Sequence, residues 1–246
     1  MRQALSWLIP PGSSTYAPDI DRLYNLILIV TGVAFVLVEA ALVYFIFKYR
    51  ARPGRKALYT HGTPTPEYIW TGVTAVVVVV IGLLSAPVWG RIKGRHSAPP
   101  GSMQIGIRAK QFEWHVTYPG PDGRLGTADD FELRGQLHVP VNTPVLATLE
   151  AEDVIHSFYV PPWRIKQDAV PGMKIPVWFE PTRVGRFELG CAELCGLGHY
   201  RMRAVVTVHT KEDYARWMAA RGQTAAMTPA ITTPAITAPT TTTASR

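Results

Sequence analysis

Cysteine is almost missing from this chain: its 246 residues include only two, Cys191 and Cys195. At most one intrachain disulfide can form. The sequence also lacks a C-x-x-C-H motif, which excludes a covalently attached c-type haem. The aspartate-rich stretch Gly120–Asp130 lacks the ligand spacing of an EF-hand, so it predicts a surface loop at a hairpin tip instead of a calcium site.

A concentrated basic surface is also missing, although the formal net charge is +7. Basic residues are scattered along the chain, and the one short cluster, Lys48–Lys56, lies between two apolar runs. Membrane topology explains a cluster in that position better than nucleic-acid binding does. We therefore expect no nucleic-acid partner.

Charge is nearly absent from the two apolar runs. Leu23–Phe47 contains one charged residue, Glu39, and Tyr68–Gly90 contains none. Each run exceeds the roughly 20 residues that a helix needs to cross a bilayer. The first run starts too late and is too long for a cleaved signal peptide. The sequence therefore predicts a transmembrane helical hairpin over residues 23–90, in contact with membrane lipid.

The orientation of the hairpin follows from its basic turn, because positively charged loops remain in the cytoplasm. The N-terminal segment 1–22 and everything after residue 90 are then extracytoplasmic, in the periplasm of a bacterium, and both termini lie on that side. A weaker basic stretch, Arg91–Arg95, opposes this orientation but precedes a whole translocated domain. We expect a two-helix protein of the cell (inner) membrane.

Residues 91–221 read as one β-rich domain. Short segments enriched in β-branched and aromatic residues are separated by Pro, Gly and Asp, as in a β-sandwich or barrel. The predicted strand segments are 103–119, 131–140, 143–152, 155–161, 174–181, 185–191 and 203–210. A short helix is predicted over Lys211–Ala220, and the Thr/Pro/Ala-rich residues 222–246 are predicted to be a disordered tail.

The stretch "CAELCGLGHYRM" carries the chemistry of this domain, with Cys191, Cys195, His199 and Met202 closely spaced. Considered alone, two cysteines in an oxidising compartment favour a disulfide. A second histidine, His156, lies upstream in "EDVIHSFYVP". Thiolate, imidazole and a weak thioether together form the ligand set of cupredoxin copper sites, whereas zinc rarely uses methionine.

The number of cysteines bears on how many copper ions could bind. A blue-copper site needs one thiolate, two imidazoles and an axial methionine, which leaves one thiolate here to spare. Two thiolates can instead bridge two copper ions, each capped by one histidine. Met202 can then be the weak axial donor to one ion, and the backbone carbonyl of Glu193 can serve the other. The other histidines lack metal spacing: His61, His96, His115, His138 and His209.

Four motifs carry a resemblance to a known family. "EDVIHSF", "IKQDAVPG" and "GCAELCGLGHYRM" follow a hairpin whose second span opens with "PEYIWT". Over residues 23–209 the chain resembles subunit II of haem–copper cytochrome c oxidase, the subunit that bears the CuA centre. Subunit II of quinol oxidases keeps the fold without the copper ligands, so the ligands present here argue against that branch.

The resemblance implies a fold and a role. The fold is a two-helix transmembrane hairpin followed by an all-β, cupredoxin-like Greek-key sandwich or barrel. The role is to accept electrons from cytochrome c at a binuclear copper centre and pass them to haem in subunit I, which also bears CuB. Oxygen is reduced there and protons are pumped, so this chain alone has no oxygen site. Subunit III is a further expected partner, and the donor is a separate protein.

Ligand roles follow from the same resemblance. Cys191 and Cys195 bridge the two coppers; the residue matching His156 shares one copper with Met202, and His199 shares the other with the carbonyl of Glu193. The resemblance also implies that the Glu193 carboxylate helps to bind magnesium at the interface with subunit I.

Interface roles follow as well. Asp168 belongs to the interface with subunit I, and Glu67 to the mouth of a proton-uptake path, although a Glu there also suits a helix N-terminus. Glu39, inside the first span, should face Lys48 or a residue of subunit I instead of lipid.

Two positions depart from the family pattern, and both concern partners. The family's aromatic cluster reads Q-W-x-W, whereas this chain has Phe112 and then Trp114. We predict that Phe112 lies near the electron donor and that Trp114 is a core residue or part of the electron path. Met173 replaces a common arginine after "AVPG". Glu152 and Asp153 are predicted to form a negative patch for a basic cytochrome c.

Two other classes of function remain open from the sequence. One is the CuA subunit of a related haem–copper enzyme such as a nitric oxide reductase, or another membrane-anchored electron carrier. The other is a non-enzymatic membrane protein in which Cys191 and Cys195 form a disulfide.

Overall fold

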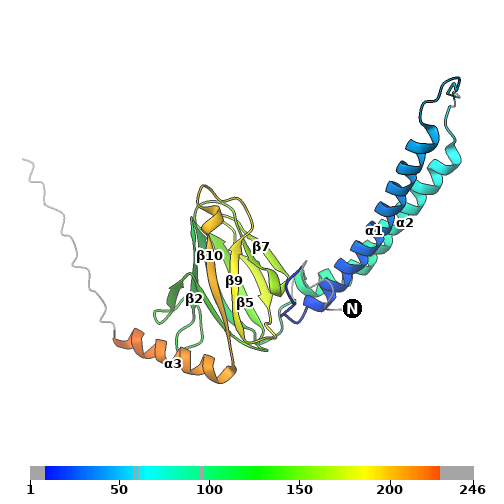
Figure 1. Ribbon diagram of the computed structural model, residues 1–246. Coiled ribbons are helices and arrows are strands. Elements are labelled where there is room, and N and C mark those ends of the chain that lie inside the picture. The colour runs from blue at the N-terminus through cyan, green and yellow to red at the C-terminus, as the bar shows by residue number, and fades with distance from the viewer. Residues whose placement is uncertain (1–8, 58, 60, 95–96, 228–246) are drawn as a thin grey trace, which may run out of the picture.

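The computed structural model describes residues 9–57, 59, 61–94 and 97–227, with side chains as far as residue 221. Two long helices, α1 (Ala17–Tyr49) and α2 (Pro64–Lys93), form a hairpin that projects from a β-sandwich (Figure 1). Both helices extend beyond the predicted apolar runs, and each has a proline in its first turn, where the missing N–H costs nothing. Their apolar side chains are exposed, as expected of surfaces that a bilayer covers.

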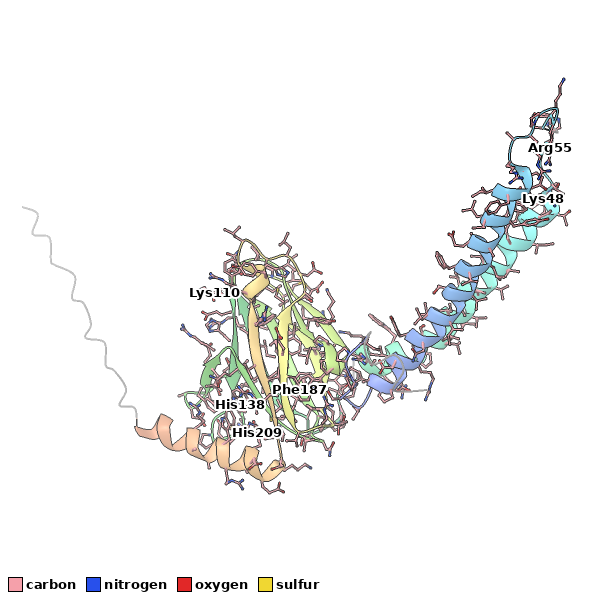
Figure 2. All side chains as sticks on the ribbon, viewed as in Figure 1. Lys48, Arg55, Lys110, His138, Phe187 and His209 are labelled. Atoms are coloured by element: carbon pink, nitrogen blue, oxygen red, sulfur yellow. The ribbon has the colours of Figure 1, made fainter. Side chains whose placement is uncertain are left out.

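The two ends of the hairpin differ in chemistry. The turn between the helices lies far from the sandwich, and Lys48 and Arg55 extend from it (Figure 2). The Arg55 guanidinium donates a 3.0 Å hydrogen bond to the carbonyl of Lys48. The start of α1 lies at the opposite end, beside the sandwich (Figure 1). This arrangement agrees with a basic turn on one side of a membrane and the sandwich on the other.

The sandwich consists of two five-stranded sheets. The strands are β1 (Met103–Lys110), β2 (Glu113–Tyr118), β3 (Phe131–Arg134), β4 (Gln136–Pro140), β5 (Val145–Ala151), β6 (His156–Val160), β7 (Ile165–Ala169), β8 (Ile175–Phe179), β9 (Gly185–Cys191) and β10 (Arg203–His209). One sheet has the order β3-β2-β1-β5-β8 and the other β4-β10-β9-β6-β7. Every predicted segment contains a strand, and residues 119–130 connect the antiparallel pair β2 and β3 as the predicted hairpin tip.

Strand β7 is the one strand that the sequence did not predict. It is an edge strand whose middle residues, Lys166, Gln167 and Asp168, are polar and partly exposed. Charged residues are typical of edge strands because they discourage pairing with other chains. Such a composition hides the apolar alternation on which strand prediction depends.

Large side chains between the sheets make the sandwich rigid. Phe179 stacks on Trp163 with ring centroids 4.7 Å apart, and Phe158 meets Trp114 edge to face at 6.0 Å. All four side chains are fully buried. Close packing of this kind allows little relative movement of the strands that enclose it.

Helix α3 (Lys211–Met227) closes the far end of the sandwich, as predicted. The backbone N–H of Asp213 donates to Thr210 Oγ1 at 3.1 Å, which caps the first turn. Trp217 stacks on His138 at 4.4 Å and anchors the helix. The helix passes residue 222, the predicted start of the tail, because Gln, Ala and Met are good helix formers. Residues 228–246 of that tail lie outside the described residues.

Candidate metal centre

The predicted copper ligands lie where strands of one sheet end side by side. His156 begins β6 and Cys191 ends β9, and these strands pair so that Phe158 lies opposite Cys191. Met202 comes directly before β10, and the N–H of Cys191 donates to its carbonyl at 3.2 Å. The sheet register therefore brings three donors together across 46 residues of sequence.

The remaining donors lie on the loop between β9 and β10, which ends in a short 3-10 turn, His199–Arg201. Cys195 Sγ lies 3.8 Å from Cys191 Sγ and 3.5 Å from His199 Nδ1. Since a disulfide requires about 2.05 Å, the two cysteines are separate thiols. The carbonyl of Glu193 lies 3.2 Å from Cys191 Sγ.

Both ring nitrogens of His156 have partners, and these orient the ring for metal binding. Nδ1 lies 3.1 Å from Met202 Sδ and 3.9 Å from Cys191 Sγ, while Nε2 lies 2.8 Å from Asp153 Oδ1. A hydrogen bond from Nε2–H to the carboxylate leaves the Nδ1 lone pair directed at the sulfur atoms. The ring is fully buried, so water does not compete for that lone pair.

The donor set fits a soft metal. All six predicted donors, from His156, Cys191, Glu193, Cys195, His199 and Met202, line one site. Burial and the neighbouring Cys191 thiol raise the pKa of Cys195 to about 11, so this residue is a thiol at neutral pH until a cation displaces its proton. Two sulfur donors, two imidazoles and a thioether select copper over the harder divalent ions.

The loop that carries Cys195 is held by residues of the β1–β2 turn. Gln111 Nε2 donates to the carbonyl of Cys195 at 2.5 Å. The ring of Phe112 lies so close to Gly198 that a Cβ there would be 2.5 Å from Phe112 Cδ2. The guanidinium of Arg201 lies 5.8 Å from the same ring. Phe112 thus lies directly on the metal loop, a packing role that the sequence did not indicate.

Trp114 is a fully buried core residue beside the site. Its ring lies edge to face with His156, with centroids 6.3 Å apart. Among the residues that the structure describes, its Nε1 has no hydrogen-bond partner. The core placement is the first of the two roles predicted for this residue.

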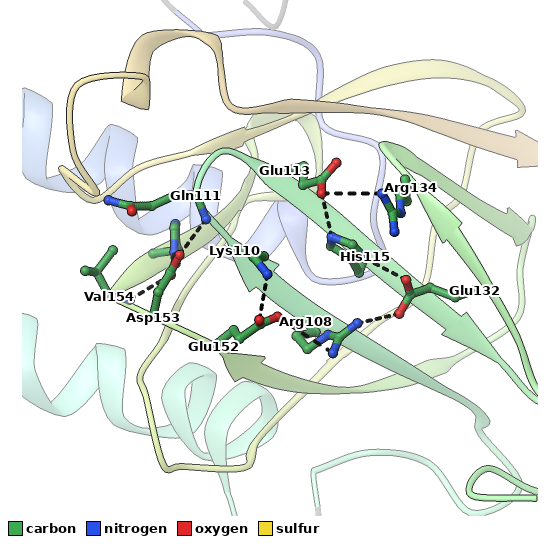
Figure 3. Close-up of polar contacts among 11 residues, drawn as sticks. Arg108, Lys110, Gln111, Glu113, His115, Glu132, Arg134, Glu152, Asp153 and Val154 are labelled. Carbon is green, nitrogen blue, oxygen red and sulfur yellow. Dashed lines mark hydrogen bonds and ion pairs between the residues drawn. The ribbon is translucent and has the colours of Figure 1, made fainter. Parts of the chain in front are cut away.

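Asp153 and Glu152, the predicted negative patch, each have close polar partners. Figure 3 shows Asp153 accepting from the N–H of Gln111, at 2.8 Å, in addition to its bond with His156. Burial raises the pKa of Asp153, but the hydrogen bonds from His156 and the backbone outweigh it, and the pKa is lower than usual. Glu152 is paired with Lys110 at 2.7 Å and with Arg108 at 3.7 Å. Glu152 is thus paired with two basic side chains, whereas Asp153 accepts hydrogen bonds from the Gln111 N–H and the His156 ring and keeps its negative charge.

A lysine that the sequence did not single out lies between two predicted interface carboxylates. Lys166 Nζ is 2.9 Å from both Asp168 Oδ1 and Glu193 Oε1, and Ser157 Oγ donates to Asp168 at 2.7 Å. The hydrogen bonds from Lys166 and Ser157 lower the pKa of Asp168. Met173, the residue after "AVPG", is exposed.

The two carboxylates of the hairpin lie apart from this site. Glu67 is in the first turn of α2, at the end of the hairpin remote from the sandwich. Glu39 is exposed on α1, and the described residues contain no ion pair between Glu39 and Lys48. The Lys48 ammonium lies over the rings of Tyr44 and Tyr49 instead, at 5.0 and 5.4 Å.

Comparisons with known proteins agree with this geometry. Residues 110–209 match the family model "Cytochrome C oxidase subunit II, periplasmic domain", and residues 3–88 match its "transmembrane domain". The chain is 34% identical to the alternative cytochrome c oxidase subunit 2 of Bradyrhizobium diazoefficiens, over 81% of this chain and 79% of that protein. It is 32% identical to cytochrome c oxidase subunit 2 of Thermostichus vulcanus, over 85% and 77%.

A solved structure is also similar. The periplasmic domain of cytochrome oxidase subunit II from Bradyrhizobium japonicum is 27% identical and covers 52% of this chain and 98% of its own, with a TM-score of 0.46. Together with the matching family models, the two-sheet architecture identifies the sandwich as cupredoxin-like, as predicted.

Proposed function

Because this chain belongs to the cytochrome c oxidase subunit II family, we propose that it is the electron-input subunit of a haem–copper oxidase. The observation that carries the proposal is the convergence of two unbonded thiols, two imidazoles, a thioether and a carbonyl on one site. A pair of copper ions held there would accept single electrons from cytochrome c and pass them to haem in subunit I.

Each protein group has a distinct task in this proposal. Cys191 and Cys195, with sulfur atoms 3.8 Å apart, would supply the two thiolates shared by the ions. His156 and Met202 would hold one ion, and His199 and the Glu193 carbonyl would hold the other. The sheet and the tightly packed loop fix these donors in place, so little has to move when the charge of the site changes.

Partners and topology form the second part of the proposal. Asp168, Lys166 and the Glu193 carboxylate face subunit I, with subunit III as a further partner. Magnesium can use the Glu193 carboxylate, whose side chain is 43% exposed, if it replaces the Lys166 ammonium that now lies 2.9 Å from one of its oxygens. The sandwich and both termini lie on the periplasmic side of a membrane-anchored subunit, and Glu67 lies near a proton-uptake path of a proton-pumping enzyme.

Donor docking forms the third part of the proposal. Glu152 and Asp153 remain the proposed negative patch for a basic donor, and Phe112 and the exposed residues of the metal loop are further candidates for contact with it. Leu197 and Tyr200, on that loop, are 96% and 76% exposed. Apolar contact near the metal suits a complex that must form and separate quickly.

The test is oxygen consumption by the assembled oxidase with reduced cytochrome c. Cys195→Ser removes a proposed bridging donor and should abolish this activity, whereas Ala192→Ser changes a residue of the same loop that is not a proposed donor and should leave it intact. Full activity of Cys195→Ser would refute the proposal. Consumption of nitric oxide in place of oxygen by the wild-type complex would assign the same centre to a nitric oxide reductase.

A further inference from the structure

An arginine clamp joins the membrane anchor to the copper-binding sandwich. The Arg164 side chain, only 11% exposed, grips Asp21 of α1: Nε lies 2.6 Å from Oδ1 and Nη2 lies 3.2 Å from Oδ2. The same guanidinium donates to the carbonyls of Pro10 and Pro161, each at 2.7 Å. Paired bonds of this kind fix direction as well as distance, because the guanidinium fork is rigid.

The segment before α1 packs over this clamp. The N–H of Ser13 donates to the carbonyl of Pro162 at 2.7 Å, and Ser14 Oγ donates to that of Trp163 at 2.8 Å. At Gly12 a Cβ would lie 2.9 Å from the Cβ of Ala17 and 3.3 Å from Asp21 Oδ2. The close fit means that the anchor and the sandwich meet along a defined surface.

Arg164 also has an unusual backbone. Its φ is +55°, in the left-handed region, where a side chain other than Gly, Asn or Asp is uncommon. Such a conformation persists only where surrounding contacts compensate for it, and it points to a role for the side chain. The four hydrogen bonds of the guanidinium supply that compensation here.

The clamp is connected to the copper site by a single strand. Arg164 directly precedes β7, and β7 pairs with β6 so that Ala169, at its other end, lies opposite His156. Five residues of strand span roughly 15 Å at about 3.3 Å per residue. The hydrogen-bonded pair β6–β7 therefore connects Arg164, which binds the anchor, to His156, a proposed copper ligand.

We propose that Arg164 and Asp21 are positioning residues for electron transfer: their ion pair sets the place of the copper site relative to the membrane helices, and so to the haem of subunit I. This inference rests on the proposed electron-input function. It concerns the step from copper to haem and not the holding of copper or the arrival of electrons.

The test uses the assembled oxidase and two variants. Arg164→Gly removes the clamp while suiting a positive φ, so the turn itself is not strained by the change. Asp21→Asn removes the partner's charge and keeps its shape. The matched control is Asn142→Gly, since Asn142 is the other non-glycine residue with positive φ in the described structure, at +50°, and its side chain makes no bond to the anchor.

The expected result is a change in one step alone. The copper-to-haem rate after photoreduction should fall about tenfold in Arg164→Gly, since a misplacement of about 1 Å can cost up to about a hundredfold in an oriented reaction. Asp21→Asn should slow the same step, and the double variant should be no slower than Arg164→Gly. The electron paramagnetic resonance spectrum of the copper, the rate from donor to copper, and all rates of Asn142→Gly should stay as in wild type.

Two outcomes would overturn the proposal. One is a wild-type copper-to-haem rate in both variants; the other is an altered copper spectrum in Arg164→Gly, which would make the residue part of the site itself. Distance measurements between spin labels at Arg55 and Lys174 test the clamp without any electron transfer, and their distribution should broaden in Arg164→Gly. A distance distribution that broadens in Arg164→Gly, while the wild-type oxidase transfers no electron from copper to haem, would refute the proposed electron-input function. That result would leave the Arg164–Asp21 ion pair as the contact that positions the sandwich on the anchor.

Discussion

Asp153 offers the sharpest test of how the protein prepares its copper site. Replacing it by asparagine keeps the shape of the side chain and an acceptor oxygen, but it removes the charge that faces Nε2 of His156 across 2.8 Å. Loss of a partner that orients a metal-binding histidine lowers metal affinity by about 10–100-fold. We expect a loss near the lower limit, about tenfold or ~1.4 kcal/mol, because the Asp153 side chain is 28% exposed and water screens part of its charge.

The assay is a competition for copper between the full-length protein and a chelator of known affinity. Glu152→Gln is the matched control: it neutralises the adjacent carboxylate, which pairs with Lys110 and contacts no copper ligand. An exposed pair of that kind contributes about 0–1 kcal/mol, and none of it at the metal. The reasoning is refuted if Asp153→Asn binds copper as tightly as wild type, or if both variants lose affinity equally.

Three further predictions concern packing, electron input and pH. Gly198→Ala should destabilise the protein by about 1–3 kcal/mol and disturb copper binding, because the new Cβ would lie 2.5 Å from the Phe112 ring; Gly190→Ala, whose Cβ meets nothing, should do neither in copper titration and thermal unfolding. Phe112→Leu keeps apolar packing and should slow reduction by the donor without changing the copper spectrum; an unchanged stopped-flow rate would exclude Phe112 from electron input. Burial and then neighbouring positive charges lower the pKa of His138 to about 4, so the unfolded chain binds more protons than the folded one between about pH 4 and 6.5. Unfolding midpoints should therefore fall as the pH is lowered through that window, and an equal fall in His138→Gln would contradict the assignment.

Much of the architecture was predictable because it depends on local patterns. Two apolar runs longer than a bilayer is thick define the hairpin, and β-branched segments broken by Pro and Gly define nine of the strands. The candidate copper donors could be selected from the sequence because five of the six lie within twelve residues and their chemistry is rare in combination. The upstream histidine, His156, lies in a separate motif, "EDVIHSF", and was added because the copper ligand set includes imidazole.

The remaining features depend on where side chains meet in space. The sequence predicted a docking role for Asp153, but it could not show that the oxygens of this residue accept hydrogen bonds from His156 and Gln111. The contact between Arg164 and Asp21 spans 143 residues, and neither residue belongs to a motif. Ionic partners across such separations become visible only when the strands and helices are assembled.

The central claim is that the two thiols bridge a pair of copper ions. It is tested most directly by copper analysis and electron paramagnetic resonance of the full-length protein, reconstituted with copper in detergent. The account predicts two copper ions per chain and one unpaired electron shared equally between them. One copper ion per chain, or no copper together with a disulfide between Cys191 and Cys195, would contradict it.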